Sequence, residues 1–190
     1  MDVGVLSSSD LGATWLPGFP QKDHDQEFVD QHAWGIEQDA DGNVYVGFST
    51  DKGPKVFRSE NNGVSWQDRS NGLPEKTADN DIFLVSIAAD PNNPGTLYLA
   101  IDDLLKKGLF RTTNYGDKWK RLKKAPGSEE VGEDRLIKCL EIDPTDSDRI
   151  FAGLYWDGLW YSENGDSLPD RRRLAHHRTI LHAGVRPGQR

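Results

Sequence analysis

The chain has 190 residues, of which 35% are hydrophobic and 28% charged, and its formal net charge is −8 at pH 7. An acidic surface repels nucleic-acid phosphates, and no apolar stretch is long enough to span a membrane, so we expect neither a nucleic-acid partner nor a membrane span. The single cysteine, Cys139, excludes an intramolecular disulfide framework, and we expect it to be a small packed residue.

A short apolar run, residues 3–7, opens the chain and leads into a polar eight-residue segment that ends in tryptophan. This turn segment recurs 51 and then a further 53 residues along, and an altered fourth copy comes after them. A period of this length is typical of repeat architectures. The defining positions are Ser8, Asp10, Gly12 and Trp15; Ser59, Asn61, Gly63 and Trp66; Thr112, Asn114, Gly116 and Trp119; and Ser162 with Asn164.

Each position of the turn segment has a physical role. The Asp or Asn side chain can bond nearby backbone, and the glycine two positions later tolerates positive φ. The closing tryptophan is amphipathic, so we expect it to fill the seam between neighbouring sheets while its indole N–H finds an acceptor. The segments resemble the Asp-box, or BNR repeat, S-x-D/N-x-G-x-S/T-W. That resemblance implies the β-propeller superfamily that includes sialidases, sortilins and xyloglucanase-like enzymes.

Between successive turn segments, two apolar runs predict two strands, and the first run of each pair ends in aspartate. A third strand leads into each turn segment, and a fourth comes after its tryptophan. The unit is therefore a four-stranded antiparallel blade. The fold class is all-β, a partial β-propeller with about three to four blades' worth of repeats. The paired runs are residues 34–39 and 44–48, 85–90 and 97–101, and 139–143 and 150–155.

The repeats end near residue 165, where the composition changes. Residues 166–190 hold six arginines against two aspartates and no Phe, Tyr or Trp, so residues 1–165 alone carry a net charge of about −12. We expect residues 1–165 to form an incomplete propeller that self-associates through open blade edges. The basic tail, 166–190, is expected to be disordered or non-native, with a nucleic-acid arm as the alternative. We expect a longer parent protein to be secreted or periplasmic.

Ligand binding is expected at the end of the blades opposite the turn segments, because successive hairpin loops alternate between the two ends. Exposed indoles beside carboxylates suit sugar rings. The alternative is that these acidic loops are only solvated surface. The candidate ligand-binding residues are Trp34, Trp156, His32 and Asp81.

One loop supports a sharper comparison. The sequence T-D-K-G at residues 50–53, with Phe57 and Arg58 shortly after it, is similar to the T-D-x-G-G-x-Y-R segment that carries a catalytic aspartate in xyloglucanase-like glycoside hydrolases. The resemblance implies a catalytic carboxyl at Asp51 or at its repeat equivalents, Asp103 and Asp157. One residue is inserted here, and the two residues after the loop depart from the pattern. The second carboxylate of those enzymes comes from a distant propeller.

Two functions stay open from the sequence. The first is a binding or scaffold module for a glycan or protein ligand, and the alternative is a fragment of a glycoside hydrolase that acts by paired carboxylates. Sialidase activity is not expected, because Tyr161 interrupts the arginine position shared by Arg58 and Arg111. Neither a metal nor a cofactor is expected, since His24 and His32 form no recognised ligand spacing.

Overall fold

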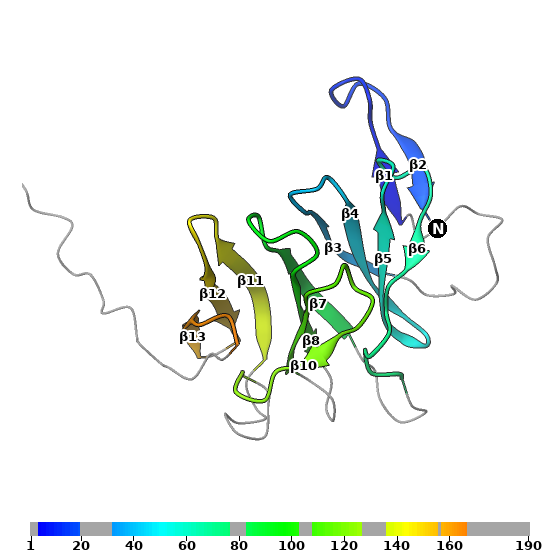
Figure 1. Cartoon of the computed structure of the whole chain (residues 1–190). Helices are drawn as coiled ribbons and strands as arrows, with labels where there is room; N and C mark the ends of the chain where they lie inside the picture. Colours follow the sequence, from blue (N-terminus) through cyan, green and yellow to red (C-terminus); the bar gives the residue numbers. More distant parts are fainter. Residues whose placement is uncertain are drawn as a thin grey trace, which may run out of the picture.

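The computed structural model shows an all-β fold, which confirms the predicted fold class. Within the part of the chain that it describes, the strands form four antiparallel sheets (Figure 1). No helix of that part is long and apolar enough to cross a membrane. The predicted tail, 166–190, lies outside the described residues except for Asp166. The described residues are 4–19, 32–76, 83–102, 108–126, 136–155 and 157–166.

Two four-stranded sheets, blade 1 and blade 2, occupy the middle of the chain, and each has its strands in sequence order. Blade 3 comes next with three strands, and a two-stranded first hairpin precedes blade 1. The first hairpin is β1 (Val5–Ser7) and β2 (Leu16–Phe19); blade 1 is β3 (His32–Gln38), β4 (Val44–Thr50), β5 (Gly53–Ser59) and β6 (Gln67–Asp68); blade 2 is β7 (Phe83–Ala89), β8 (Leu97–Asp102), β9 (Gly108–Thr112) and β10 (Lys120–Arg121); blade 3 is β11 (Ile137–Asp143), β12 (Asp146–Leu154) and β13 (Gly158–Glu163).

The first strands of the three blades lie side by side. Strand β3 contacts β7, and β7 contacts β11, so the blades fan out with their first strands next to one another (Figure 1). This is the arrangement of a β-propeller, in which blades surround an axis lined by their first strands. The chain therefore forms part of a propeller.

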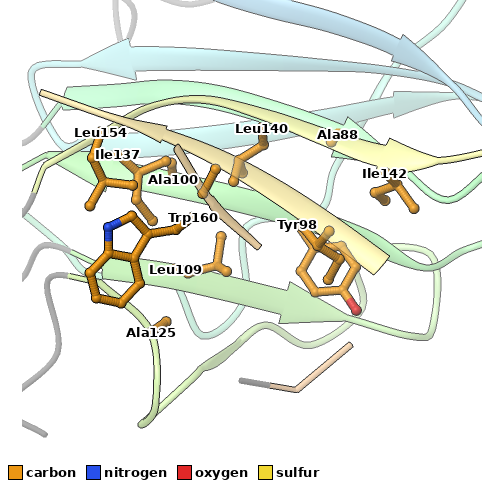
Figure 2. Close-up of a cluster of buried hydrophobic side chains, with 12 residues drawn as sticks. Ala88, Tyr98, Ala100, Leu109, Ala125, Ile137, Leu140, Ile142, Leu154 and Trp160 are labelled. Atoms are coloured by element: carbon orange, nitrogen blue, oxygen red, sulfur yellow. The ribbon is translucent and has the colours of Figure 1, made fainter. Parts of the chain in front are cut away.

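Apolar side chains fill the seams between successive blades. In seam 1, Tyr45 and Val56 of blade 1 pack against Ile87, Leu99 and other residues of blade 2. Figure 2 shows seam 2, where blade 2 and blade 3 enclose a second cluster. Full burial of one such side chain contributes roughly 1.5–3 kcal/mol, so the seams are the main source of stability. The members of seam 2 include Tyr98, Ala100, Leu109, Leu140, Ile150 and Trp160.

The turn segments share a set of hydrogen bonds. In the first copy, Ser8 Oγ accepts a bond from the Gly12 N–H at 2.9 Å, and Asp10 Oδ1 accepts one from the Thr14 N–H at 2.8 Å. The second and third copies repeat both bonds. In the altered fourth copy, which the structure describes as far as Asp166, the Ser162 hydroxyl donates to Asn164 Oδ1 at 3.1 Å. These positions therefore close the loop between the third and fourth strands.

The three tryptophans of these segments differ in burial. Trp119 is 2% exposed, and its Nε1 donates to the backbone oxygen of Arg69 in blade 1 at 2.6 Å, so it fills seam 1. Trp66 is half-buried and Trp15 is 59% exposed, and each donates instead to a glycine oxygen of its own segment at 3.1 Å. The expectation of a seam-filling residue is therefore wrong for Trp15, because the described chain places no blade before the first hairpin.

Candidate functional site

The turn segments lie at the same end of the blades as the aspartate-ended turns. Tyr115, in the third turn segment, donates its backbone N–H to Gly95 O and its hydroxyl to Asp41 Oδ2, both at 2.9 Å. Gly95 belongs to the β7–β8 turn and Asp41 to the β3–β4 turn. The β4–β5 turn, with Asp51, therefore lies at the opposite end of blade 1.

The repeated aspartates Asp39, Asp90 and Asp143 each accept a backbone hydrogen bond within these turns. Asp90 is 2% exposed, and its Oδ1 accepts hydrogen bonds from the Asn92 N–H at 2.9 Å and from the hydroxyl of Ser147 in blade 3 at 2.8 Å. Burial acts to raise the pKa of Asp90, but the hydrogen bonds that it accepts outweigh burial and hold that pKa below its usual value. The sequence showed the regular spacing of these three aspartates but did not predict that their carboxylates bond the turns.

A cleft of about 680 Å³ opens beside the β4–β5 turn. One wall is the turn and strand β5, and the other is the connection that leaves β6 and runs back along β5. Asp51 stands exposed at the tip of the turn. The lining comprises Asp51, Lys52, Pro54, Lys55, Asp68 and residues 70–76.

The turn that carries Asp51 is fixed by local bonds. The hydroxyl of Thr50 donates to Gly53 O at 2.7 Å and accepts from the Lys52 N–H at 3.2 Å. The Lys76 N–H donates to Lys52 O at 2.9 Å, which ties the connection to the turn. Gly53 has φ +117°, and a Cβ there would lie 3.0 Å from the backbone of this connection, so glycine is required. These contacts therefore fix the conformation of the turn that carries Asp51.

Charged groups on the cleft wall pair with one another. Lys55 Nζ lies 3.0 Å from Asp68 Oδ2, and the Ser70 N–H donates to Asp68 Oδ1 at 2.8 Å. Burial acts to raise the pKa of Asp68, but the bonds from Ser70 and Lys55 outweigh it and lower that pKa. Asp68 is therefore a carboxylate at neutral pH and orients Lys55. The cleft offers carboxylates and ammonium groups, which suit a ligand rich in hydroxyls.

The other predicted site residues are dispersed. His32 and Trp34 lie on β3, with ring centroids 6.3 Å apart, and Trp34 is 50% exposed. His32 pairs with Ser49, so it lies at the same end of blade 1 as Asp51, but neither aromatic residue lines the cleft. Asp157 lies on the β12–β13 turn of blade 3. Asp81, Asp103 and Trp156 lie outside the described residues.

The acidic side chains of the described residues show two further features. Among the described residues, no group of three or more His, Cys, Asp and Glu side chains is placed to hold a metal ion. Glu37 on β3 is partly buried, and burial, with the negative charge of Glu141 on β11 as the second cause, raises its pKa. These two carboxyls come from first strands on either side of β7, which agrees with the convergence of the blades.

Comparison with known proteins connects the chain to xyloglucanases. No family model matches it. A xyloglucanase from a Paenibacillus species is 29% identical over 189 residues, and the match covers 78% of this chain but 17% of that enzyme. The chain therefore spans about a sixth of the length of this relative.

Solved structures show the same fold. The GH74 xyloglucanase from Xanthomonas campestris superposes with a TM-score of 0.62 at 18% identity, over 83% of this chain and 23% of the enzyme. A GH74 enzyme from Niastella koreensis gives a TM-score of 0.59 at 13% identity, over 85% of this chain and 25% of that chain. At these identities the likeness establishes the fold.

Proposed function

We propose that this chain is a segment of a glycoside-hydrolase-like propeller and that the cleft beside Asp51 binds polysaccharide. We also propose that the turn segments are Asp-boxes with a structural role. The observation that carries the proposal is the placement of Asp51, on a fixed turn at a cleft lined by paired charges. The similarity to a Paenibacillus xyloglucanase supports xyloglucan as the glycan.

In this proposal Asp51 supplies one carboxyl of a catalytic pair. Glycoside hydrolysis needs two carboxyls roughly 5–9.5 Å apart, one of which is free to exchange a proton or attack the sugar. Asp68 does not suit the second role, because both of its oxygens accept bonds from Lys55 and Ser70. The second carboxyl is therefore expected from another part of a longer protein, and this chain alone should bind the glycan without cleaving it.

The binding proposal is tested by calorimetric titration of the chain with xyloglucan oligosaccharides. The variant Lys55→Glu places a negative charge beside Asp68 in the cleft, so we expect binding to weaken by about tenfold or more, about 1.4 kcal/mol. Lys123→Glu is the matched control, because this exposed lysine lies on the connection that leaves β10 of blade 2, outside the lining of the cleft. Absence of binding by the folded chain, or an equal loss in the control, would refute a glycan site in this cleft.

The catalytic role of Asp51 is tested in a longer protein that contains this chain. Asp51→Asn should lower the rate of reducing-sugar release from xyloglucan by about 10²-fold or more, because an amide can neither exchange the proton nor attack. Affinity for the oligosaccharide should change by less than about threefold, since the side chain keeps its shape. If the rate of reducing-sugar release were unchanged, Asp51 would have no catalytic role, and the binding-module function would be the one that remains.

A further inference from the structure

The outer edge of blade 2 carries a run of basic residues, which we call the basic stripe. Residues 118–124 hold five cations in seven positions, although the chain as a whole has a net charge of −8. All five side chains are exposed. Among the described residues, no carboxylate forms an ion pair with any lysine of the stripe. The basic stripe consists of Lys118, Lys120, Arg121, Lys123 and Lys124.

Buried residues between the cations fix the stripe in place. Trp119 is buried in seam 1, and Leu122 and Ala125 pack into seam 2. The Trp119 N–H donates to Asn71 O and the Leu122 N–H donates to Leu109 O, both at 2.8 Å. Every third residue of this segment is therefore held, and the cations between them project from a fixed backbone. A ligand that binds a fixed surface loses less free energy to the ordering of that surface.

Blade 1 provides an internal comparison. Residues 65–71 occupy the equivalent positions 53 residues earlier, and β6 pairs with β5 in the register in which β10 pairs with β9. That segment carries Asp68 and Arg69, so its charges cancel. Charged side chains on an edge strand can prevent it from pairing with other chains. Because the edge strand of blade 1 lacks such a run, edge protection does not account for five cations on blade 2.

The stripe lies at the rim of the propeller. Strand β10 is the outermost strand of its sheet, and blade 2 lies between blades 1 and 3. Further blades of a propeller are added around the axis, beside blades 1 and 3, and not at the rim of blade 2. No residue of the stripe lines the Asp51 cleft. The stripe is therefore a separate charged surface that belongs to blade 2 itself.

The chemistry of the stripe favours an acidic polysaccharide over a nucleic acid. A lysine ammonium has three donors, which bind carboxylate and hydroxyl oxygens alike. Duplex DNA carries one charge per about 1.7 Å, and the acidic remainder of the chain would repel it. Single-stranded nucleic acid stacks its bases on aromatic side chains, but Trp119, the one aromatic residue of the segment, is buried.

We propose that the basic stripe binds a linear polysaccharide that carries carboxylates, such as a polymer of uronic acid. An extended backbone rises about 3.3 Å per residue, so the stripe is at most about 20 Å long and one strand wide. Such a surface fits a single sugar chain. The ammonium groups pair with its carboxylates and donate to its hydroxyls. This second glycan site differs from the Asp51 cleft in its place and in the charge of its ligand.

Calorimetric titration with an oligosaccharide of galacturonic acid tests the proposal. The double variant Lys120→Gln/Lys124→Gln removes two cations of the stripe and should weaken binding by at least about tenfold. The matched control Lys138→Gln/Arg149→Gln removes the same charge from blade 3, where both side chains pair with aspartates, and should change the affinity by less than about threefold. Cooperative urea unfolding shows whether both variants are folded. Added salt should weaken binding to the unaltered chain.

Other ligands separate the possible partners. The fully methyl-esterified oligosaccharide keeps the sugar chain without its charges and should not bind the stripe. Absence of binding by the acidic form at low salt, an equal loss in both double variants, or equal affinity for the ester would overturn the proposal. Tighter binding to a single-stranded oligonucleotide of equal charge, or to vesicles of anionic lipid, would overturn it in favour of that partner.

Discussion

At the residue scale, one position of each of the first three turn segments adopts a left-handed backbone without glycine. Leu11, Asn62 and Tyr115 have φ between 56° and 58°. Such a conformation costs a bulky residue roughly 1–2 kcal/mol. Tyr115 offsets this cost through its bond to Asp41 and through the guanidinium of Arg58, 5.2 Å from its ring centroid. The side chain of Leu11 is fully exposed, so its strain is an uncompensated local cost.

Asparagine tolerates this backbone conformation. Its substitution for Tyr115 and for Leu11 should therefore change the free energy of unfolding differently. Tyr115→Asn removes the contacts that connect blade 2 to the β3–β4 turn, and we expect the free energy of unfolding to fall by about 1–2 kcal/mol. Leu11→Asn should leave it unchanged or raise it by up to about 1 kcal/mol. Urea unfolding of both variants measures the difference. An equal loss in both would mean that the contacts of Tyr115 contribute nothing.

Alkaline pH should weaken seam 2 through Tyr98. This residue is 1% exposed and donates its hydroxyl to Gly165 O at 2.7 Å, and burial is the main cause that raises its pKa from 10.0 to about 12. The neutral phenol is favoured in the folded chain. Stability is therefore retained below pH 10 and falls as the pH rises from 10 towards 12, by about 2 kcal/mol from this residue.

The variant Tyr98→Phe isolates this contribution. It cannot ionise, so its free energy of unfolding should fall less between pH 10 and 12 than that of the unaltered chain, although the lost bond makes it less stable at neutral pH. Urea unfolding across this range gives both values, and tyrosinate absorbance reports the ionisation. An identical alkaline slope in the two proteins would show that Tyr98 does not carry the effect.

At the scale of elements, the burial of each tryptophan depends on the completeness of the preceding blade. Trp119 faces complete blade 1, where its indole donates to the backbone oxygen of Arg69 and its own backbone oxygen would lie 2.4 Å from a Cβ on Gly72. Trp66 packs against the cluster of Val46, Phe48 and Phe57 in its own blade, and Trp15 is mostly exposed. The tryptophan of the turn segment thus contributes a different amount to stability in each copy.

Alanine substitutions of the three tryptophans should destabilise the chain in the order of the burial of each side chain. Trp119→Ala is expected to lower the free energy of unfolding by about 3–5 kcal/mol, because it opens a cavity in seam 1 and leaves a carbonyl unpaired. Trp66→Ala should cost less, and Trp15→Ala less than about 1 kcal/mol. Thermal and urea unfolding provide the values. A loss at Trp15 as large as that at Trp119 would contradict the role of the preceding blade.

The sequence predicted the blades because their strands and turns repeat at a fixed spacing, and it placed Asp51 opposite the turn segments because hairpin loops alternate. It did not predict that Asp68 joins Asp51 at one cleft. That proximity depends on the connection of residues 69–76, which has no periodic pattern and is positioned by single bonds such as Lys76 N–H to Lys52 O. Nor did it predict the exposure of Cys139, because the spacing of the repeats does not determine whether another blade packs beside blade 3.

At the scale of the whole molecule, the three blades form one array with different surfaces at its two ends. The end that carries the turn segments is bonded internally, by Tyr115, Ser147 and the repeated aspartates. The opposite end carries Asp51 on the β4–β5 turn, which is held by Thr50 and by the connection through Lys76, and the cleft opens beside this turn. The end of the blades that carries Asp51 is therefore available to bind a ligand. That a ligand binds at this end is the central claim of the proposed function.

The most direct test of this claim is a nuclear magnetic resonance titration of the chain with a xyloglucan oligosaccharide, which locates binding residue by residue. We expect the amide shifts to concentrate at residues 51–55 and 68–76 around the cleft. The turn segments around Asn61 and Asn114 should not shift. Shifts confined to the turn segments, or no shifts at saturating oligosaccharide, would contradict the assignment of the glycan site to the Asp51 cleft.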